Sequence, residues 1–390
     1  MEEPWYIKDS KLDIETWRYD IRIDFRKWSK FLFNKKKYGV YRTRTRTVKH
    51  LFMWQYETYL HIRMPEIKTE TWKIVTVDCP IMRPYAKHTY HFEGLVLDLV
   101  KYMTVKKVAE HLKIHQNTVM GIVKYYVWIS KDQADYKDLK YLWIDETSRK
   151  KWHHYISLWV NLETRKVCSI SEWKGKEAIR DIRKEIEEHN GNADSIEQIS
   201  IDLSPAFISW TKEEFRKAIV TYDKFHVTKL MLNTMDEVRK KEAIQNKILR
   251  GSKYLRLYNK SNLNEDKQKK LEELMRQNES LTKVYQLKEN LKVFYDLPTY
   301  EEARDYLTTW CEHALSVNIP VVTNFVKTIK RHREWILNHI RNKITNGVLE
   351  WINSVIQLVK RRARWYTNIE NLKAMIYLLK WDFEILLPTY

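Results

Sequence analysis

YLWIDETS, residues Tyr141 to Ser148, is the stretch from which the fold can be worked out. Its first four residues, Tyr141 to Ile144, suit a buried β-strand, and Asp145 and Glu146 follow at once. We therefore expect an acid to be presented where a strand leaves the core, which makes Asp145 a candidate metal ligand. Glu146 faces the other side of the strand, because successive side chains alternate, and is not a first-choice catalytic acid.

The residues that follow predict a small α/β domain. Three strands form an antiparallel meander, and a helix, a strand ending at Asp202, another helix and a strand ending at Asp223 come next. The predicted ranges are 141–145, 155–162, 166–173, 176–189, 196–203, a helix from Pro205, and 218–222. This order is that of a ribonuclease-H-like α/β domain, whose first and fourth strands are neighbours. The fold would bring Asp145 and Asp202 together.

Beyond His226 the pattern is helical. Charged amphipathic segments predict helices at 229–249, 265–278, 281–295 and 300–313, and another helix spans Val321 to Asn342. The turn signal Asn346-Gly347 precedes Glu350, which we place in the first turn of a new helix. That helix runs into a basic cluster, which is either a solvated helix end or a clamp on the DNA backbone: Lys360, Arg361, Arg362 and Arg364.

Asp145, Asp202 and Glu350 together predict a metal site. Each acid alone is explained more readily by a structural role than by catalysis, since all three sit beside turns or helix starts. On the predicted elements, however, they would form an oxygen-rich site of the kind that Mg²⁺ or Mn²⁺ prefers. Two such ions support in-line phosphoryl transfer, which is the chemistry of nucleases and strand-transfer enzymes.

The amino-terminal 90 residues alternate as β-strands do. The segment Lys35 to His50 carries seven Lys and Arg and no acid. Within it Arg42, Arg44 and Arg46 would lie on one face of a strand, where they suit DNA phosphates. A charged edge strand that prevents aggregation explains the pattern equally well.

Residues His91 to Trp128 predict three helices. The second begins after the N-cap residue Thr104, and a short turn separates it from the third, which is the pattern of a helix-turn-helix. The turn and the start of the third helix would present Gln116, Asn117 and Thr118 to base edges, with Lys106, Lys107 and Lys124 near phosphates. A helical hairpin without a DNA role remains the alternative.

Composition agrees with a nucleic-acid partner. The chain has 70 basic and 51 acidic residues, a net charge of +19, and no low-complexity segment. Cys79, Cys168 and Cys311 form no CxxC pair, which favours a reducing compartment and speaks against a cysteine-built zinc site. With no signal peptide and no apolar run long enough to span a bilayer, we expect an intracellular protein without membrane association.

Several ordered blocks resemble the DDE transposases of the ISL-three insertion-sequence family. They are WIDETSRKKWHHYISLWVN (143–161), IDLSPAF (201–207), YDKFHVTK (222–229), LRGSKYLRL (249–257) and TNGVLEWINSVIQLVKRRARWYTNIEN (345–371). The resemblance implies that Asp145, Asp202 and Glu350 are the DDE acids, which bind two Mg²⁺ or Mn²⁺ ions. It also implies that the D-x-x-H element ending at His226 lies beside the site, where His226 would orient a water or contact a phosphate; a structural histidine at the start of a helix is the alternative.

The chain departs from this family in two ways. Similar proteins carry an amino-terminal zinc-binding segment with two paired-cysteine motifs, but no cysteine occurs here around Lys35–Gly39 or Thr69–Trp72, so we expect no zinc. Trp351 and Trp365 replace glycines that follow the third acid and the RRAR run. The substitution next to Glu350 would alter the approach to the metal ions and leaves room for an inactivated descendant.

These observations predict five parts. They are a β-rich basic domain with a degenerate zinc-binding segment (1–90), a helix-turn-helix (91–138), the first part of the catalytic core (139–228), an all-α insertion (229–344) and the carboxy-terminal helical part of the core (345–390). The expected function is transposition: binding of terminal inverted repeats in double-stranded DNA, strand cleavage, and strand transfer to target DNA by a homo-oligomer in a synaptic complex. We expect a prokaryotic cytoplasmic protein associated with the nucleoid. The alternatives are an inactive DNA-binding regulator and a structure-selective nuclease without strand transfer.

Overall fold

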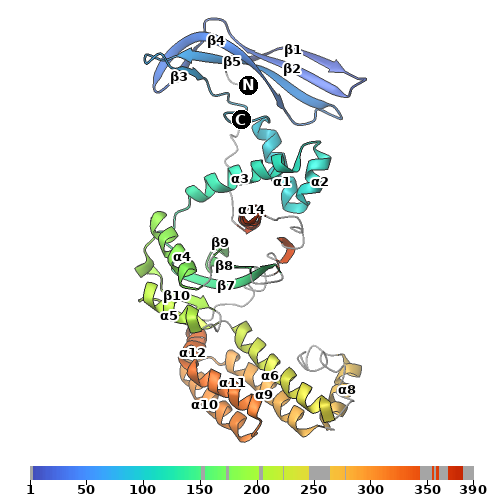
Figure 1. Cartoon of the computed structure of the whole chain (residues 1–390), viewed down its shortest axis with the longest axis vertical. Helices are drawn as coiled ribbons and strands as arrows, with labels where there is room; N and C mark the ends of the chain where they lie inside the picture. Colours follow the sequence, from blue (N-terminus) through green and yellow to red (C-terminus); the bar gives the residue numbers. More distant parts are fainter. Residues whose placement is uncertain are drawn as a thin grey trace. The chain divides into compact units, whose positions relative to one another are not determined.

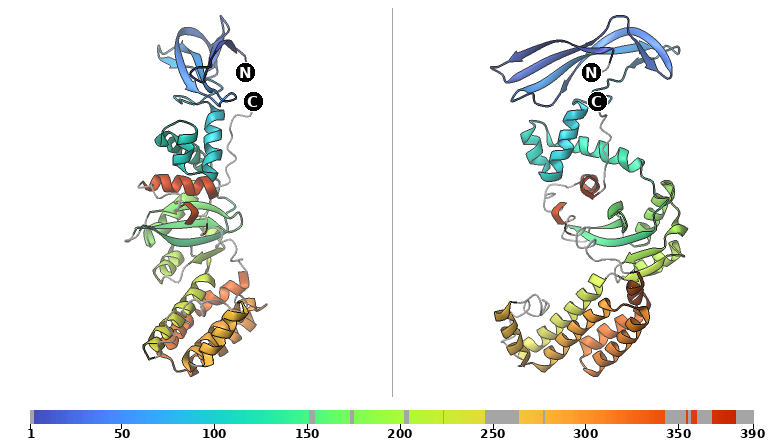
Figure 2. Two further views of the ribbon diagram at one scale, coloured as in Figure 1. Left: turned by 90° about the vertical axis from the view of Figure 1, so that its right-hand side faces the viewer. Right: turned by 180° about the vertical axis from the view of Figure 1, so that it is seen from behind.

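The computed structural model describes residues 3–150, 154–172, 175–201, 205–222, 224–245, 264–276, 278–342, 354, 357–359 and 368–380. The chain divides into two compact units (Figures 1 and 2). The first comprises Met1–Asp132 and Arg361–Tyr390, and the second comprises Gln133–Lys360. No helix among the described residues is long and apolar enough to cross a membrane.

The first unit begins with a six-stranded sheet, so the prediction of a β-rich amino-terminal segment is confirmed. Its strands lie in the order β1-β2-β5-β4-β3, and β6 pairs with β5. The bounds are β1 Trp5–Asp13, β2 Arg18–Phe25, β3 Lys30–Phe33, β4 Lys36–Lys49, β5 Glu57–Lys68 and β6 Ile74–Thr76. The pair β2–β5 is parallel, whereas β1–β2, β3–β4, β4–β5 and β5–β6 are antiparallel. Alternating apolar residues such as Ile21, Ile23, Ile62 and Met64 face one core because side chains alternate along a strand.

Three helices follow the sheet: α1 Tyr90–Tyr102, α2 Val105–His111 and α3 Gln116–Asp132. Thr104 caps α2 as predicted, since its hydroxyl accepts the backbone N–H of Lys107. The apolar residues at helical spacing in α2 and α3 are buried, whereas in α1 Val96 and Leu97 are buried but Leu95 and Leu99 are only half-buried. The reason is that α1 packs against both α2 and α3, which selects the side of the helix that points inward.

A helix from the carboxy-terminal part of the chain completes the first unit. Helix α14, Ile369–Lys380, packs against α3 (Figures 1 and 2). Trp128 of α3 and Tyr377 of α14 meet edge to face, with ring centroids 5.8 Å apart. The sequence assigns residues 345–390 as one piece to the catalytic core, whereas the structure packs α14 onto the helix-turn-helix because its apolar residues are buried there.

The second unit is built on a five-stranded sheet in the order β11-β10-β7-β8-β9. The strands are β7 Tyr141–Lys150, β8 His154–Asn161, β9 Lys166–Ser171, β10 Gln198–Ile201 and β11 Ile219–Tyr222. The predicted antiparallel meander of the first three strands is confirmed, as is the neighbouring position of the first and fourth strands. Helices α4 Lys176–Glu188 and α5 Pro205–Glu214 pack against each other beside the sheet, and η1 Ala193–Ser195 leads into β10.

The predicted end of the first of these strands is wrong. The sequence ends it at Asp145, but β7 continues to Lys150, and Asp145 lies inside the strand opposite Leu158. The polar residues after Ile144 stay in the strand because β8 pairs with them antiparallel, in one register as far as Ser148 and, after a register shift, at Lys150.

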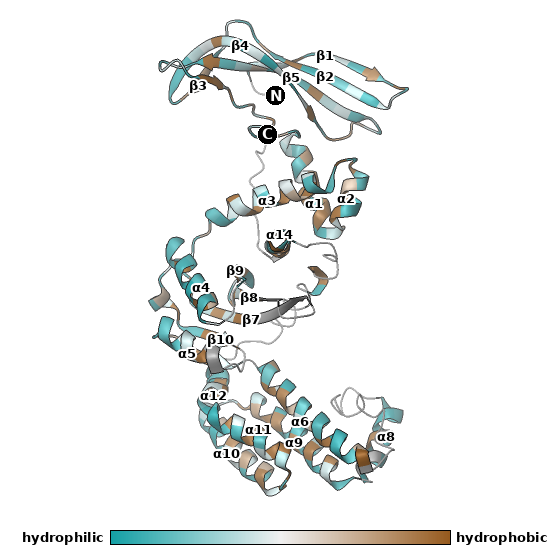
Figure 3. Cartoon of the chain, in the orientation of Figure 1, coloured by the Kyte–Doolittle hydropathy of each residue, from teal (hydrophilic) through white to brown (hydrophobic). Residues whose placement is uncertain are grey.

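Beyond β11, the part of the second unit that the structure describes is helical, as predicted. Its helices are α6 Lys224–Gln245, α8 Glu265–Arg276, α9 Glu279–Asp296, α10 Tyr300–Ser316, α11 Pro320–Arg331 and α12 Arg333–Asn342. Figure 3 shows apolar and polar residues alternating along α6, α9, α10 and α11, as in amphipathic helices. The predicted single helix from Val321 to Asn342 breaks at His332, because the His332 side chain bonds to Tyr222 of β11. Beyond that break, α12 packs against β11.

Candidate functional site

Strands β10 and β11 of the second unit end at one edge of the sheet, beside β7, which continues past them to Lys150. Strand β10 runs parallel to β7, with Ser200 opposite Trp143, and parallel to β11, with Ile201 opposite Tyr222. Trp143, Ile201 and Tyr222 are all buried. The edge is therefore anchored in the core, which is the setting in which α/β proteins hold catalytic side chains rigidly.

Two of the predicted acids, Asp145 and Asp202, follow the buried Trp143 and Ile201 in sequence. The backbone of Asp145 belongs to β7, while its side chain, all of Asp202 and all of Glu350 lie outside the described residues. The basic cluster Lys360, Arg361, Arg362 and Arg364 lies outside them as well. Within the described part of the chain, no group of three or more His, Cys, Asp or Glu side chains could hold a metal ion.

His226 lies in the first turn of α6, directly after β11. Its side chain is half-buried, and its ring meets the exposed ring of Phe225 edge to face at 5.7 Å. Asp223, the first residue of the D-x-x-H element, is outside the described residues. The described geometry thus puts His226 next to the sheet edge at which β10 and β11 end.

A buried contact that the sequence did not predict supports this edge. The Tyr222 hydroxyl and Nδ1 of His332 are 3.0 Å apart, and the amide of Asn338 donates to the carbonyl of Val220 at 3.1 Å. Trp335 stacks on His332 and meets Tyr222 edge to face. Burial lowers the pKa of His332, which favours a neutral ring in this contact. No periodic pattern points to these residues, because the bond spans 110 positions.

The helix-turn-helix presents polar side chains where the sequence predicts them. Gln116 and Asn117 are exposed and Thr118 is half-buried at the start of α3. The Nδ1 atom of His115 accepts the backbone N–H of Asn117 at 3.1 Å, so a side chain fixes the first turn. Lys106 and Lys107 are exposed on α2, and Lys124 is half-buried on α3. Lys106 is also 3.8 Å from Glu110 in an exposed ion pair.

Lys49 joins the sheet to the helix-turn-helix. It is 6% exposed, and its ammonium contacts Glu57 at 2.9 Å and donates to the carbonyl of Leu112 at 3.0 Å. Lys113 reaches the other oxygen of Glu57 at 2.6 Å. Leu112 and Lys113 lie directly after α2, so a cation on the sheet satisfies carbonyls at the carboxy-terminal end of that helix. The sequence analysis missed this contact, since it counted Lys49 only as one of the basic residues.

The three arginines of β4 do not have the same environment. Arg42 forms an ion pair with Glu66, and Arg46 donates to the carbonyl of Ala86 at 2.7 Å. Arg44 is exposed and makes no hydrogen bond or ion pair with any described residue. The register shift in this pair lies between Val40 and Arg42, so the three arginines stay in one unbroken register opposite β5. Since β3 pairs only with Lys36–Gly39, this part of β4 has a free edge, and both explanations of its charge stay open.

In this chain an ion pair joins the two turns in which the resembling proteins carry cysteines. Lys36 and Glu70 form an exposed ion pair at 2.7 Å between the β3–β4 turn and the β5–β6 turn. Cys79, Cys168 and Cys311 are buried and unpaired. Burial raises the pKa of the Cys79 and Cys311 thiols to about 11 and that of Cys168 to about 12, so the described cysteines are poor thiolate ligands.

Comparison with known proteins gives the chain a family. A model described as a transposase matches residues 142–376, and a model described as the helix-turn-helix domain of transposase family ISL3 matches residues 77–127. The transposase for insertion sequence element IS1001 of Bordetella parapertussis is 26% identical over 351 residues, which cover 85% of this chain and 83% of the relative. The transposase for insertion sequence element IS1557 of Mycobacterium tuberculosis is 24% identical over 352 residues, covering 83% and 78%. Because the transposase match spans more than half of the 390 residues, the chain belongs to the ISL3 family of insertion-sequence transposases.

Proposed function

We propose that the protein moves an insertion sequence by binding the element's ends and by cutting and rejoining DNA strands with a DDE triad. In this proposal Asp145, Asp202 and Glu350 are the catalytic acids. Family membership gives the general activity, and the arrangement of the strands supports the assignment of the acids.

The observation that carries the proposal is the register between β7 and β10. Ser200 is opposite Trp143 in a parallel pair, and Asp202 and Asp145 each come two residues later. Residues two apart in a strand face the same side, and neighbouring strands are about 4.8 Å apart. If the pairing continues, the two carboxylates share one level and one face. Because Ile201 is opposite Tyr222 in the parallel pair of β10 and β11, the next residues, Asp202 and Asp223, would also be opposite each other if that pairing continues.

We also propose that the second unit is a ribonuclease-H-like domain with a helical insertion. The strand order β9-β8-β7-β10-β11, antiparallel for the first three and parallel for the last three, supports this assignment. The division into the domains 1–90, 91–138, 139–228, 229–344 and 345–390 is part of the same proposal. The packing of α14 on α3 argues for moving the last helix out of the core domain.

Divalent metal ions fit the proposed donor set. Three carboxylates offer only hard oxygen ligands, which Mg²⁺ and Mn²⁺ prefer, and no soft sulfur ligand is near them in sequence. Two bound ions would supply Lewis-acid stabilisation of the attacking and leaving oxygens. Asp145, Asp202 and Glu350 would hold them, and His226 at the same sheet edge would orient water or contact a phosphate.

The DNA would be held by the first unit and by the basic cluster. Gln116, Asn117 and Thr118 at the start of α3 would contact base edges, while Lys106, Lys107 and Lys124 contact phosphates. The β4 residues Arg42, Arg44 and Arg46 and the cluster Lys360, Arg361, Arg362 and Arg364 would neutralise further phosphates. Joining two element ends to a target requires a synaptic complex, which we propose is a homo-oligomer.

Catalysis is tested by cleavage of element-end DNA with Mg²⁺ or Mn²⁺. Asp145→Asn should lower cleavage by at least about 100-fold, because it removes a direct metal ligand. Glu146→Gln is the matched control, since it neutralises the next acid on the same strand and should leave cleavage within about twofold. Equal activity of Asp145→Asn and the unsubstituted protein would overturn the assignment. Strand-joined products distinguish a transposase from a nuclease that only cuts.

DNA recognition is tested separately by binding without metal. Asn117→Ala should reduce binding to the element end by about 1–3 kcal/mol and leave binding to unrelated DNA unchanged. Lys107→Ala should weaken binding to element-end DNA and to unrelated DNA alike, and it should lower the slope of log affinity against log salt by about one. If Asn117→Ala weakened both DNAs equally, the start of α3 would not contact base edges.

A further inference from the structure

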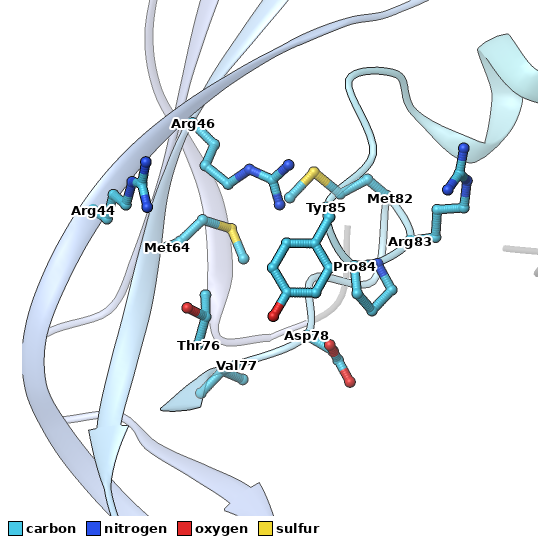
Figure 4. Close-up of a pocket in the computed structure, with 10 residues that line it drawn as sticks. All are labelled: Arg44, Arg46, Met64, Thr76, Val77, Asp78, Met82, Arg83, Pro84 and Tyr85. Atoms are coloured by element: carbon cyan, nitrogen blue, oxygen red, sulfur yellow. The ribbon is translucent and has the colours of Figure 1, made fainter. Parts of the chain in front are cut away.

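A pocket of about 210 Å³ opens in the first unit between β4 and the loop that leads to α1 (Figure 4). Arg44 and Arg46 contribute from β4, and Tyr85 contributes from the loop. The pocket is smaller than the roughly 300–1,000 Å³ of sites for drug-sized ligands. Its size therefore suits part of a larger molecule, such as a single nucleotide.

The floor of the pocket is apolar and its rim is charged. Met64 and Met82 are each 2% exposed and line the pocket with their polarisable thioethers, which pack well against aromatic faces. Arg44 adds an exposed guanidinium with no hydrogen bond or ion pair to any described residue. The flat face of a nucleobase would thus pack on the methionines, and its phosphate would pair with Arg44.

Tyr85 is held in a conformation that exposes its ring. The side chain is 89% exposed, and the backbone has a φ of 62°, which costs a non-glycine residue energy. Figure 4 shows the Arg46 guanidinium and the Tyr85 ring extending into the same space from the strand and from the loop. An exposed aromatic ring beside a pocket offers a face on which a nucleobase can stack.

Two arginines, Arg46 from β4 and Arg83 from the loop itself, hold the loop that carries Tyr85. Arg46 donates to the carbonyl of Ala86 at 2.7 Å. Arg83 contacts both carboxylate oxygens of the fully buried Glu93, at 3.0 and 2.9 Å, and lies 4.1 Å from the ring centroid of Tyr125. Because Arg46 and Arg83 are occupied in this way, Arg44 is the cation of the pocket that remains available to a ligand.

We propose that this pocket binds one nucleotide of a DNA strand whose base has left the helical stack. The base lies against the Tyr85 ring and over Met64, and its phosphate contacts Arg44. The proposal rests on the proposed function only in taking DNA as the ligand. Extrusion of one base would let the sheet hold DNA at a distorted position, in addition to the groove contacts of α3.

Asp78 adds a preference among bases. Its carboxylate is exposed at the pocket and makes no hydrogen bond or ion pair with any described residue. A carboxylate accepts a hydrogen bond from an exocyclic amino group, as on cytosine, whereas the N3–H of thymine lies between two carbonyl oxygens that repel the carboxylate. The pocket should therefore prefer cytosine to thymine.

The test uses the full chain and four duplexes of one mixed sequence that contains no element end. One is fully paired, and the others carry a single unpaired cytosine, thymine or abasic nucleotide. Affinity for the cytosine duplex should exceed that for the paired and abasic duplexes by about fivefold or more, the lower range for stacking of one base on an aromatic ring. Thymine should bind more weakly than cytosine. Excess free deoxycytidine monophosphate should not displace the cytosine duplex, since the site takes the nucleotide as part of a strand.

Matched variants assign the effect to the pocket. Tyr85→Asn removes the ring but keeps a residue that tolerates a positive φ, so it should abolish the preference for unpaired cytosine, while Tyr85→Phe retains it. Trp28→Asn is the control, because Trp28 is 96% exposed at a φ of 67° in another turn of the same unit and does not line the pocket. Arg44→Ala should weaken binding of the cytosine duplex more than Arg22→Ala, which removes an equal charge from β2. Circular dichroism checks that each variant is folded.

Four results would overturn the proposal. They are equal affinity for the paired and cytosine duplexes, equal affinity for the abasic and cytosine duplexes, a preference that survives Tyr85→Asn, and a loss of preference as large in Trp28→Asn. Complete displacement by the free nucleotide would instead assign the site to mononucleotides. Because the duplexes carry no element end, failure here leaves the proposed cleavage reaction standing, and failure of the Asp145→Asn test leaves this pocket untouched.

Discussion

Lys49 is a buried side chain that ties the sheet to the helix-turn-helix. A buried ammonium is costly unless it is paired and hydrogen-bonded, and Lys49 has both Glu57 and the carbonyl of Leu112 as partners. Lys113, which has a φ of 51° in the turn between α2 and α3, reaches the same carboxylate. The turn is therefore held from the sheet, which fixes where α3 begins.

Replacing Lys49 should destabilise the first unit. Lys49→Met keeps the length and the apolar stem but leaves the Leu112 carbonyl without its donor, so we expect a loss of about 1–3 kcal/mol. Denaturant unfolding measures this loss. Lys106→Met is the control, because its exposed ion pair contributes about 0–1 kcal/mol at most. Equal losses of unfolding free energy in the two variants would show that the buried Lys49 contact does not contribute to stability.

Glu57 should make the stability of this contact depend on pH. Burial would raise the pKa of its carboxyl, but hydrogen bonds from Lys113 and Lys49 outweigh burial and lower the pKa to about 2. A carboxyl whose pKa is lower in the folded state stabilises the fold above its unfolded value of about 4.3. That stability is lost as the pH falls from there through about 2.

Glu57→Gln tests this dependence. The Tm of the unsubstituted protein should exceed that of Glu57→Gln most at pH 5 to 7, and the difference should shrink as the pH falls from about 4.5 toward 2. Scanning calorimetry at a series of pH values gives the comparison, with the exposed Glu110→Gln on α2 as control. A difference in Tm that stayed constant down to pH 2.5 would contradict the assignment to Glu57.

The helix-turn-helix depends on packing more than on its own helices. Helix α2 has only seven residues, well below the length at which an isolated helix is stable in water. Its buried residues Val105, Val108 and Ala109 contribute most of its stability, and Thr104 at the N-cap satisfies one of its free N–H groups.

Loss of this cap should cost a measurable amount. Thr104→Ala removes the hydroxyl that accepts the Lys107 N–H at 3.3 Å, so stability should fall by about 1 kcal/mol. Thr104→Ser keeps the hydroxyl and should stay within about 0.5 kcal/mol. Urea unfolding followed by circular dichroism compares them, and a Thr104→Ser variant as unstable as Thr104→Ala would assign the effect to the lost methyl group.

The first unit is assembled from two distant parts of the chain. Residues 361–390 are grouped with residues 1–132, and α14 buries Leu372, Ala374, Ile376 and Tyr377. Lys131 of α3 lies 5.2 Å from the Tyr377 ring centroid, which adds a cation–π contact to the apolar packing. The fold of the helix-turn-helix therefore depends on residues more than 200 positions later in the sequence.

A charge in the α14 interface should loosen α3 selectively. Ile376→Asp buries a carboxylate without a partner at a fully buried position, which should cost several kcal/mol and raise hydrogen exchange in α3. Helix α4, in the second unit, should exchange as before. Lys373→Asp on the same helix, at a half-buried position, is the milder control. Unchanged exchange in α3 would mean that α14 does not support it.

The amino-acid sequence was sufficient for features that depend on neighbours along the chain. Alternation predicted the strands, the 3.6-residue period predicted α2, α3 and α4, and Thr104 marked a helix start, because propensity, capping and burial patterns act over a few residues. The family resemblance, confirmed by the transposase matches, added the activity. Local pattern also suggested that β7 and β10 are neighbours, since few topologies fit that order of strands.

Tertiary contacts decided what local pattern leaves open. The continuation of β7 past Asp145 depends on β8, the break at His332 depends on Tyr222, and the position of α14 depends on α3. The pocket beside Tyr85 and the bonds of Lys49 likewise join β4 to segments about 40 to 60 positions away. YLWIDETS thus specifies a strand and its acids, but the end of that strand is set by its partners, because pairing and burial between distant segments outweigh the preference of any one residue.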